Sequence, residues 1–163
     1  GLKLNLMTYT GRPELAEAAN VIKANLEQAG FTITLDVVEY TTVLEPKALA
    51  KEHDLILMSR SYYFDMPDAA GYLQSDFGCK GSNNFNVFCD KAFDALLQGT
   101  ATAEKPQERT AIFAKAAQYL IDNKVGLPIY HDASRRVLSS RVQNTMLDPL
   151  DQTLLTNKTT LGK

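Results

Sequence analysis

The chain has 163 residues, of which 45 % are hydrophobic and 22 % are charged, an ordinary globular composition with enough chain for one core. The formal net charge of −2 at pH 7 gives no electrostatic footprint for nucleic acid, so we expect no nucleic-acid partner. No apolar run approaches the roughly 20 residues that a membrane-spanning helix needs. Because the chain starts at Gly1 inside a strand pattern, we expect it to be a piece of a longer protein.

The first forty residues predict a βαβ unit. Leucines alternate with polar residues over residues 2–6, which indicates a strand. A helix is expected next, because Pro13 suits a first helical turn and Gly30 suits the position just past a helix end. Alternation returns over residues 31–37 as a second strand. The short helical connection makes the two strands parallel, with a right-handed crossover.

A third strand is predicted after a short helix. Thr41 or Thr42 can cap that helix, which ends near Leu49, and Pro46 should delay its start. The uninterrupted apolar run at residues 55–58 then suits a strand covered on both faces, as in a parallel sheet. We expect this strand to be the central one of a doubly wound sheet.

The second half of the chain predicts mainly helices. A short helix should open at Pro67, and another should follow Asp90, which suits an N-cap. The longest helix should run from Pro106 to Gly126. The remaining expectations are strand at residues 127–130 and 137–138, and a tail or severed linker at residues 156–160.

Polar and aromatic residues follow the third strand at once. Arg60, Tyr62, Tyr63 and Asp65 lie just past its carboxyl end, where open α/β sheets bind ligands. The alternative interpretation is a surface loop with packed aromatics and a helix N-cap at Asp65 or Asp68.

The loop after the first strand carries Tyr9 and Arg12 and should lie at the same edge of the sheet. Two such loops make one wall of a ligand cleft. Small-ligand sites bury most of their ligand, so a second lobe would have to supply the opposite wall.

The two cysteines, Cys79 and Cys89, are too far apart for a CxxC redox or zinc pair. Two buried free thiols and a disulfide that closes the loop between them both fit the sequence. An extracytoplasmic setting favours the disulfide. The turn-forming residues 81–84 would let the two ends of that loop meet.

Catalytic and cofactor motifs are absent from the sequence. There is no GxSxG elbow, GxGxxG loop or Walker A loop, and His53 and His131 stand apart from other metal ligands, so we expect no cofactor and no metal site. Asp65 and Asp68 could still form an acid/base pair. A small α/β hydrolase-like or nucleotide-binding enzyme domain is therefore the alternative function, and a bare interaction domain is a third.

The chain resembles the second, C-terminal lobe of the family 5 extracellular solute-binding proteins of ABC importers, which handle peptides, nickel and opines. The resemblance covers nearly all of the chain and rests on the order and spacing of several short motifs rather than on any one of them. These motifs are at residues 4–15, 30–33, 54–63, 66–68, 82–85, 89–90, 94–97 and 127–130.

The resemblance implies one lobe over residues 1–163, an α/β fold like a type II periplasmic-binding-protein lobe with a mostly parallel sheet flanked by helices. It implies a non-enzymatic role: binding a peptide, nickel chelate or similar small organic solute against a missing N-terminal lobe. It also implies a periplasmic or extracellular protein, free or lipid-anchored, that docks on an ABC permease in the membrane. The cysteines should then form a disulfide.

The implied ligand-binding residues are Tyr9, Arg12, Arg60, Tyr62, Tyr63, Asp65, Asn83 and Asn84. Peptide binders often place an aspartate in the cleft loop to hold the α-amino group of the ligand, and Tyr63 falls near that position here. The Arg-Ser-Tyr and Arg-Pro-Glu-Leu stretches look more like the nickel and opine branch. Nickel in that branch is carried as a chelate, so it needs no histidine cluster.

Overall fold

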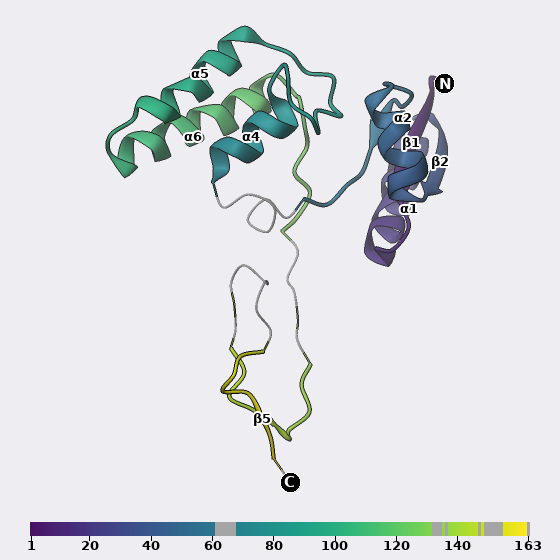
Figure 1. Cartoon of the computed structure of the whole chain (residues 1–163). Helices are drawn as coiled ribbons and strands as arrows, with labels where there is room; N and C mark the ends of the chain where they lie inside the picture. The colour runs from purple at the N-terminus through teal and green to yellow at the C-terminus, as the bar shows by residue number, and fades with distance from the viewer. Residues whose placement is uncertain (61–67, 132–134, 136, 147, 149–154, 163) are drawn as a thin grey trace. The chain divides into compact units, whose positions relative to one another are not determined.

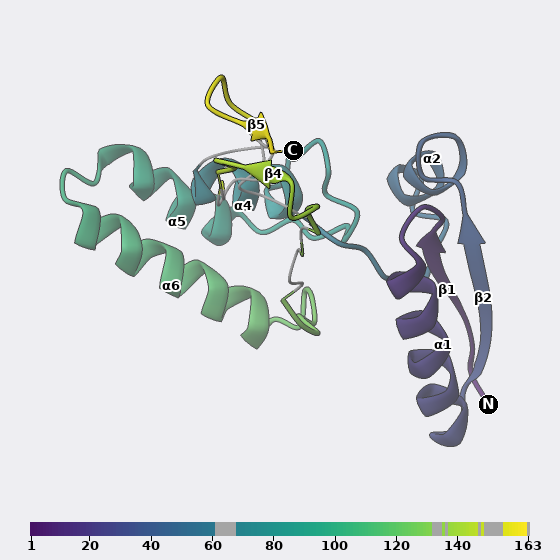
Figure 2. The same cartoon turned by 90° about the horizontal axis from the view of Figure 1, so that it is seen from below.

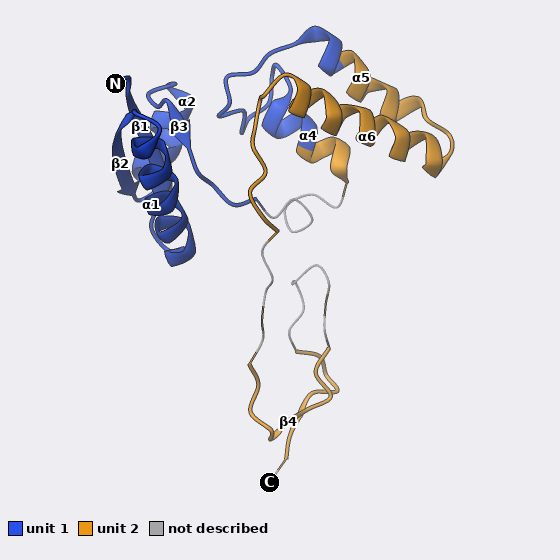
Figure 3. Cartoon of the chain, turned by 180° about the vertical axis from the view of Figure 1, so that it is seen from behind, with its two compact units in different colours: residues 1–60, 73–94 blue, residues 61–72, 95–163 orange. Residues whose placement is uncertain are grey.

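The computed structural model describes residues 1–60, 68–131, 135, 137–146, 148 and 155–162. The chain divides into two compact units (Figure 3). Unit 1 comprises residues 1–60 and 73–94, and unit 2 comprises residues 61–72 and 95–163. The division passes through two helices, α4 (Ala69–Phe77) and α5 (Lys91–Thr102).

Unit 1 contains the predicted βαβ unit, β1 (Lys3–Tyr9), α1 (Pro13–Gln28) and β2 (Thr32–Val38) (Figure 1). The two strands are parallel, with Lys3 opposite Thr32 and Tyr9 opposite Val38. A third parallel strand, β3 (Leu55–Ile56), pairs with the other side of β1, which gives the order β2-β1-β3. The mostly parallel α/β architecture is confirmed. The central place of the third strand was wrong, because β1 lies between the other two.

The two faces of this sheet are covered differently. Alternating residues of β1 place Leu6 on the face that α1 covers with Leu15 and Ala19, together with Ile33 and Leu57. On the opposite face, Met7 is buried with Leu44, Ala48 and Phe85. The apolar run at residues 55–58 contributes to both faces, Leu55 and Leu57 to the first and Ile56 and Met58 to the second, as its lack of alternation predicts.

A five-residue π-helix, η1 (Tyr40–Leu44), leads directly into α2 (Glu45–Leu49), which supplies Ala48 to the second face. The cap was predicted at Thr41 or Thr42, but Glu39 is the N-cap residue. Its carboxylate accepts hydrogen bonds from the backbone N–H and hydroxyl of Thr42, at 2.6 and 2.8 Å. These bonds lower the pKa of the Glu39 carboxyl, the backbone N–H contributing most.

Both long helices are followed by a residue in the left-handed conformation. Gly30 ends α1 as predicted, with φ +93° and its N–H bonded to the Glu27 carbonyl. The longest helix, α6 (Pro106–Asp122), was predicted to end at Gly126 but ends earlier. Lys124 takes the left-handed conformation there, with φ +55° and its N–H bonded to the Ile121 carbonyl.

In unit 2, α6 runs alongside α5 in both views of the molecule (Figures 1 and 2). Leu97 of α5 and Ala116 and Leu120 of α6 are buried, so each of these helices buries apolar side chains. Within the described part of the chain, no helix combines the length and apolar character needed to cross a membrane.

The end of the chain departs from the sequence-based expectation. β4 (Val142–Gln143) pairs antiparallel with β5 (Thr160–Leu161), which begins at the last residue of the stretch 156–160 predicted as a tail or severed linker (Figure 2). The strands predicted at residues 127–130 and 137–138 are not formed. Leu127 is 85 % exposed and Val137 is 96 % exposed. A run of apolar residues forms a strand only where a neighbouring strand pairs with it.

Candidate functional site

The carboxyl ends of the three parallel strands meet at one edge of unit 1. Tyr9 is the last residue of β1, and Tyr40 lies two positions after the end of β2. The two rings pack edge to face, with centroids 5.1 Å apart and an interplanar angle of 70°. The Tyr9 hydroxyl accepts a 3.4 Å hydrogen bond from the backbone N–H of Ser59, which follows β3. Residues from all three strand ends are thus brought together.

Arg60, the next residue along, is held by a carboxylate that sequence analysis did not single out. Its Nε donates to Oδ2 of Asp76 at 2.7 Å and its Nη2 donates to Oδ1 at 2.9 Å. Asp76 lies on α4 and is 5 % exposed, and the Arg60 side chain is 19 % exposed. This bidentate ion pair fixes the guanidinium at the strand edge, because Nε and Nη2 both donate to the same carboxylate.

The positive charge of Arg60 is one of the influences on the pKa of Tyr40. Burial raises the pKa of the Tyr40 hydroxyl, and the negative charge of Glu45 adds to that rise. The positive charge of Arg60 opposes it. Tyr40 is thus neutral at physiological pH and faces an environment of mixed charge. Sequence analysis did not identify Tyr40 as a residue of the strand edge. The available signal was that it follows the second strand as Tyr9 ends the first.

Of the other residues predicted for the cleft wall, the structure describes Arg12 but not Tyr62, Tyr63 or Asp65. Arg12 is the N-cap residue of α1 and forms a 3.4 Å ion pair with Glu14. Its side chain is partly exposed, as a residue at the strand edge would be. Tyr62, Tyr63 and Asp65 lie outside the described residues. The ligand-binding roles of all these residues stay predictions.

Asp68 is engaged in local structure. Its Oδ1 accepts the backbone N–H of Ala70 at 2.8 Å, which is N-terminal capping of α4. Its Oδ2 lies 2.6 Å from Nη2 of Arg109, whose guanidinium also sits 5.5 Å from the centre of the Phe113 ring and donates to the Thr100 carbonyl. The sequence allowed Asp68 to be a helix cap, and the structure shows that role.

Cys79 and Cys89 form a disulfide, as the family resemblance implied. Two asparagine side chains of the loop that it closes donate hydrogen bonds within the loop and to residues that precede it. Nδ2 of Asn84 donates to the carbonyls of Gly78 and Phe88, at 2.9 and 2.5 Å. Nδ2 of Asn83 donates to the Ser75 hydroxyl at 3.2 Å. Both predicted ligand-binding asparagines therefore shape this loop.

The disulfide loop also reaches the sheet. Phe85, at its middle, is 2 % exposed and packs with Met7, Leu44 and Ala48 on the second face. The loop is therefore part of the core of unit 1 as well as a candidate part of the site, because its aromatic side chain covers sheet surface that would otherwise be exposed.

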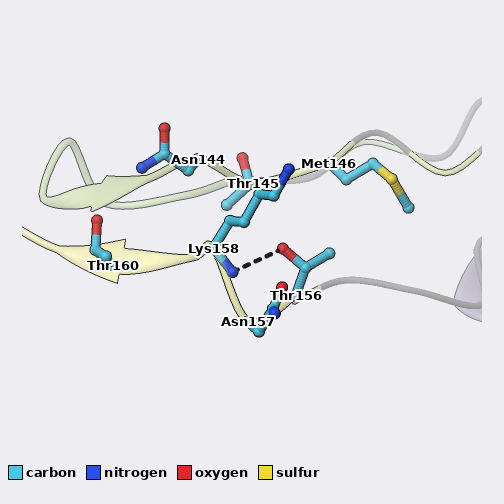
Figure 4. A pocket seen from close by; sticks show the side chains of 7 residues that line it. All are labelled: Asn144, Thr145, Met146, Thr156, Asn157, Lys158 and Thr160. Carbon is cyan, nitrogen blue, oxygen red and sulfur yellow. Dashed lines mark hydrogen bonds between the residues drawn. The ribbon is translucent and has the colours of Figure 1, made fainter.

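The β4–β5 hairpin of unit 2 bears a shallow hollow (Figure 4). Lys158 is the charged residue of its lining, and the backbone N–H of Lys158 donates to the Thr156 hydroxyl at 3.2 Å. The other lining residues are Asn144, Thr145, Met146, Thr156, Asn157 and Thr160. Among the described lining residues, Lys158 is the one cation and none is an acid, so this hollow offers less chemistry than the strand edge. Among the described residues, no group of three or more His, Cys, Asp or Glu side chains could hold a metal ion.

No protein-family model matches the chain, but curated proteins do. The chain is 26 % identical over 140 residues to the probable di/tripeptide-binding protein 5 of Pseudomonas aeruginosa. This match covers 84 % of the chain and 26 % of that protein. It is 23 % identical over 141 residues to the dipeptide-binding protein of Escherichia coli. The chain thus spans about a quarter of the length of the curated relatives that it matches.

Solved structures share the fold. The pheromone receptor PrgZ matches all of the chain with a TM-score of 0.77 and 19 % identity, the match covering 31 % of that receptor. NikA of Staphylococcus aureus, in complex with Ni(L-His)2, matches 98 % of the chain with a TM-score of 0.75 and 19 % identity, over 34 % of that protein. These structures confirm the type II periplasmic-binding-protein fold predicted from the sequence, and the curated relatives of the chain are di/tripeptide-binding and dipeptide-binding proteins.

Proposed function

We propose that this chain is one lobe of a solute-binding protein of an ABC importer, with the strand edge at Tyr9, Tyr40 and Arg60 as one wall of its ligand cleft. The observation that carries the proposal is that relatives with a peptide-binding role match 84–86 % of the chain. The strand edge supports it, because parallel sheets bind ligands at the carboxyl ends of their strands. The opposite wall belongs to a lobe outside this chain, and both units here form the single lobe predicted from the sequence.

The proposed solute is a short peptide or a nickel chelate. Relatives in Pseudomonas aeruginosa are named for dipeptides and tripeptides, and the structural neighbour from Staphylococcus aureus holds Ni(L-His)2. Both solute types carry carboxylates, which positively charged side chains attract. Arg12 and Arg60 are the proposed positive groups at this edge, and Arg60 is held there by its ion pair with Asp76. The protein acts without turnover, and a membrane permease receives the solute from it.

The proposed location is periplasmic or extracellular. The neighbour from Helicobacter pylori is described as a periplasmic binding protein associated with an ABC transporter. The Cys79–Cys89 disulfide agrees with an oxidising compartment, since disulfides persist outside the cytoplasm.

Isothermal titration calorimetry of the full-length protein that contains this chain tests the proposal. Ala-Ala, Ala-Phe, a tripeptide and Ni(L-His)2 are the probes, and we expect micromolar or tighter binding of at least one. The isolated chain is the matched control and should bind the same probe at least tenfold more weakly, because it supplies one wall of the cleft. Equal affinity of the isolated chain, or loss of each peptide by hydrolysis during the titration, would contradict a two-lobe binding protein.

A further inference from the structure

We propose that the Cys79–Cys89 disulfide is a reversible redox site of unit 1, which a thiol reductant opens and oxidation closes again. This redox role is separate from solute binding and does not depend on it. Its structural consequence is that reduction loosens the loop of residues 79–89, which packs on the second face of the sheet through Phe85.

Exposure and backbone strain both make this disulfide easy to reduce. Cys89 is exposed whereas Cys79 is partly buried, so Cys89 is the more accessible end of the bond. Val87, inside the closed ring, has φ +58°. This left-handed conformation is unfavourable for a β-branched residue, and opening the ring gives the valine freedom to leave it. Exposed or strained disulfides are the labile ones, whereas relaxed structural disulfides resist reduction.

Asn84 makes the opening reversible. Its Nδ2 donates to the carbonyl of Gly78, which precedes Cys79, and to the carbonyl of Phe88, which precedes Cys89. Neither hydrogen bond involves the sulfur atoms, so both can persist after reduction. The two thiols then stay near each other, which favours re-formation of the disulfide when an oxidant is present.

The exchange is a two-electron step. A thiolate of the reductant attacks the Cys89 sulfur, the S–S bond breaks, and Cys79 leaves as a thiolate that takes up a proton. A second thiol of the reductant loses its proton and attacks the mixed disulfide, and Cys89 leaves and is protonated in turn. The reductant ends as a disulfide, and the protein gains two thiols.

Reduction acts on the sheet through the middle of the loop. Phe85 is 2 % exposed and packs with Met7 and Leu44 on the second face. Nδ2 of Asn86 donates to the backbone carbonyl of Asp76 at 3.5 Å. Without the covalent link, the detached loop has more conformations available to it, so it leaves these contacts more often.

Equilibration of the full-length protein in a series of reduced and oxidised glutathione mixtures tests the proposal, with Cys79 and Cys89 thiols counted by alkylation and peptide mass. We expect both thiols to appear within the series and to be lost again when oxidised glutathione is restored. Relaxed structural disulfides resist this reductant. A bond that stays oxidised throughout the series would overturn the proposal.

Val87→Asn tests the contribution of strain. Asparagine tolerates the left-handed conformation better than valine, so the equilibrium constant for reduction should fall about two- to fivefold. Val137→Asn makes the same substitution at an exposed valine outside the ring and should leave that constant unchanged. Equal constants for the unsubstituted protein and Val87→Asn would refute the strain argument.

Hydrogen exchange measured by mass spectrometry tests the structural consequence. In the reduced protein, amides of residues 40–48 and 79–89 should exchange faster, whereas those of α1, which covers the other face, should not change. Unchanged exchange at residues 40–48 and 79–89 after complete reduction would refute the loosening of the second face.

Discussion

The Arg60–Asp76 ion pair should contribute more to the unfolding free energy than an exposed ion pair does. Asp76 is 5 % exposed, so removing its partner leaves a carboxylate buried without a counter-charge. Losing one member of a buried pair typically costs about 3–5 kcal/mol of unfolding free energy. The Arg60 side chain is 19 % exposed and water can reach it, so we expect the lower end, about 3 kcal/mol, for Arg60→Ala.

The reverse substitution should cost less. In Asp76→Ala the group that loses this carboxylate is the guanidinium, which is the more exposed partner and can turn its charge toward water. We therefore expect Arg60→Ala to destabilise more than Asp76→Ala. The double variant should be more stable than the sum of the single losses predicts, because no unpaired charge remains.

Urea denaturation of the chain, followed by far-UV circular dichroism, measures these differences as shifts in the transition midpoint. A loss of about 3 kcal/mol corresponds to a melting temperature lower by roughly 6–12 °C in a chain of this size. Lys158→Ala in the β4–β5 hairpin is the control, because its exposed side chain should contribute little. Strictly additive losses at Arg60 and Asp76 would refute the buried-pair argument.

Three other predictions concern stability. Replacing both Cys79 and Cys89 with serine should lower the unfolding free energy by about 3 kcal/mol for a separation of ten residues, and reductant should destabilise the unsubstituted chain but not this variant. Lys124→Gly should raise the urea midpoint by relieving a left-handed lysine, worth about 0.5–1 kcal/mol, whereas Gly126→Ala, where the backbone needs no glycine, should not lower it. Because the pKa of Tyr40 is raised above its ordinary value of 10.0, its stabilising effect is complete below pH 10 and is lost as the pH rises through the folded-state pKa. Unfolding curves between pH 9 and 11.5 should therefore show a smaller loss for Tyr40→Phe than for the unsubstituted chain, and parallel losses would contradict the shift.

Local patterns were enough to predict the βαβ unit and its helix boundaries. Alternation in β1 and β2 and the spacing of Leu15 and Ala19 on α1 describe single elements, and each element has one apolar face to bury. Pro13 and Gly30 act on the backbone of their own turn, so their effects need no distant partner. The family resemblance added the disulfide and the fold type, which spacing alone left open.

Which elements pair was decided only by the tertiary structure. Periodicity shows that a run is apolar but does not show what covers it, so β1 rather than β3 took the centre of the sheet, and residues 127–130 formed no strand. Arg60 was expected at the wall of a ligand cleft, and nothing in the sequence indicated that it also binds Asp76, sixteen positions away on another element. Tyr40 joins Tyr9 because parallel register aligns the ends of β1 and β2. Such contacts depend on the spatial order of the strands in the sheet. That order is set by the packing of the whole sheet rather than by any one segment.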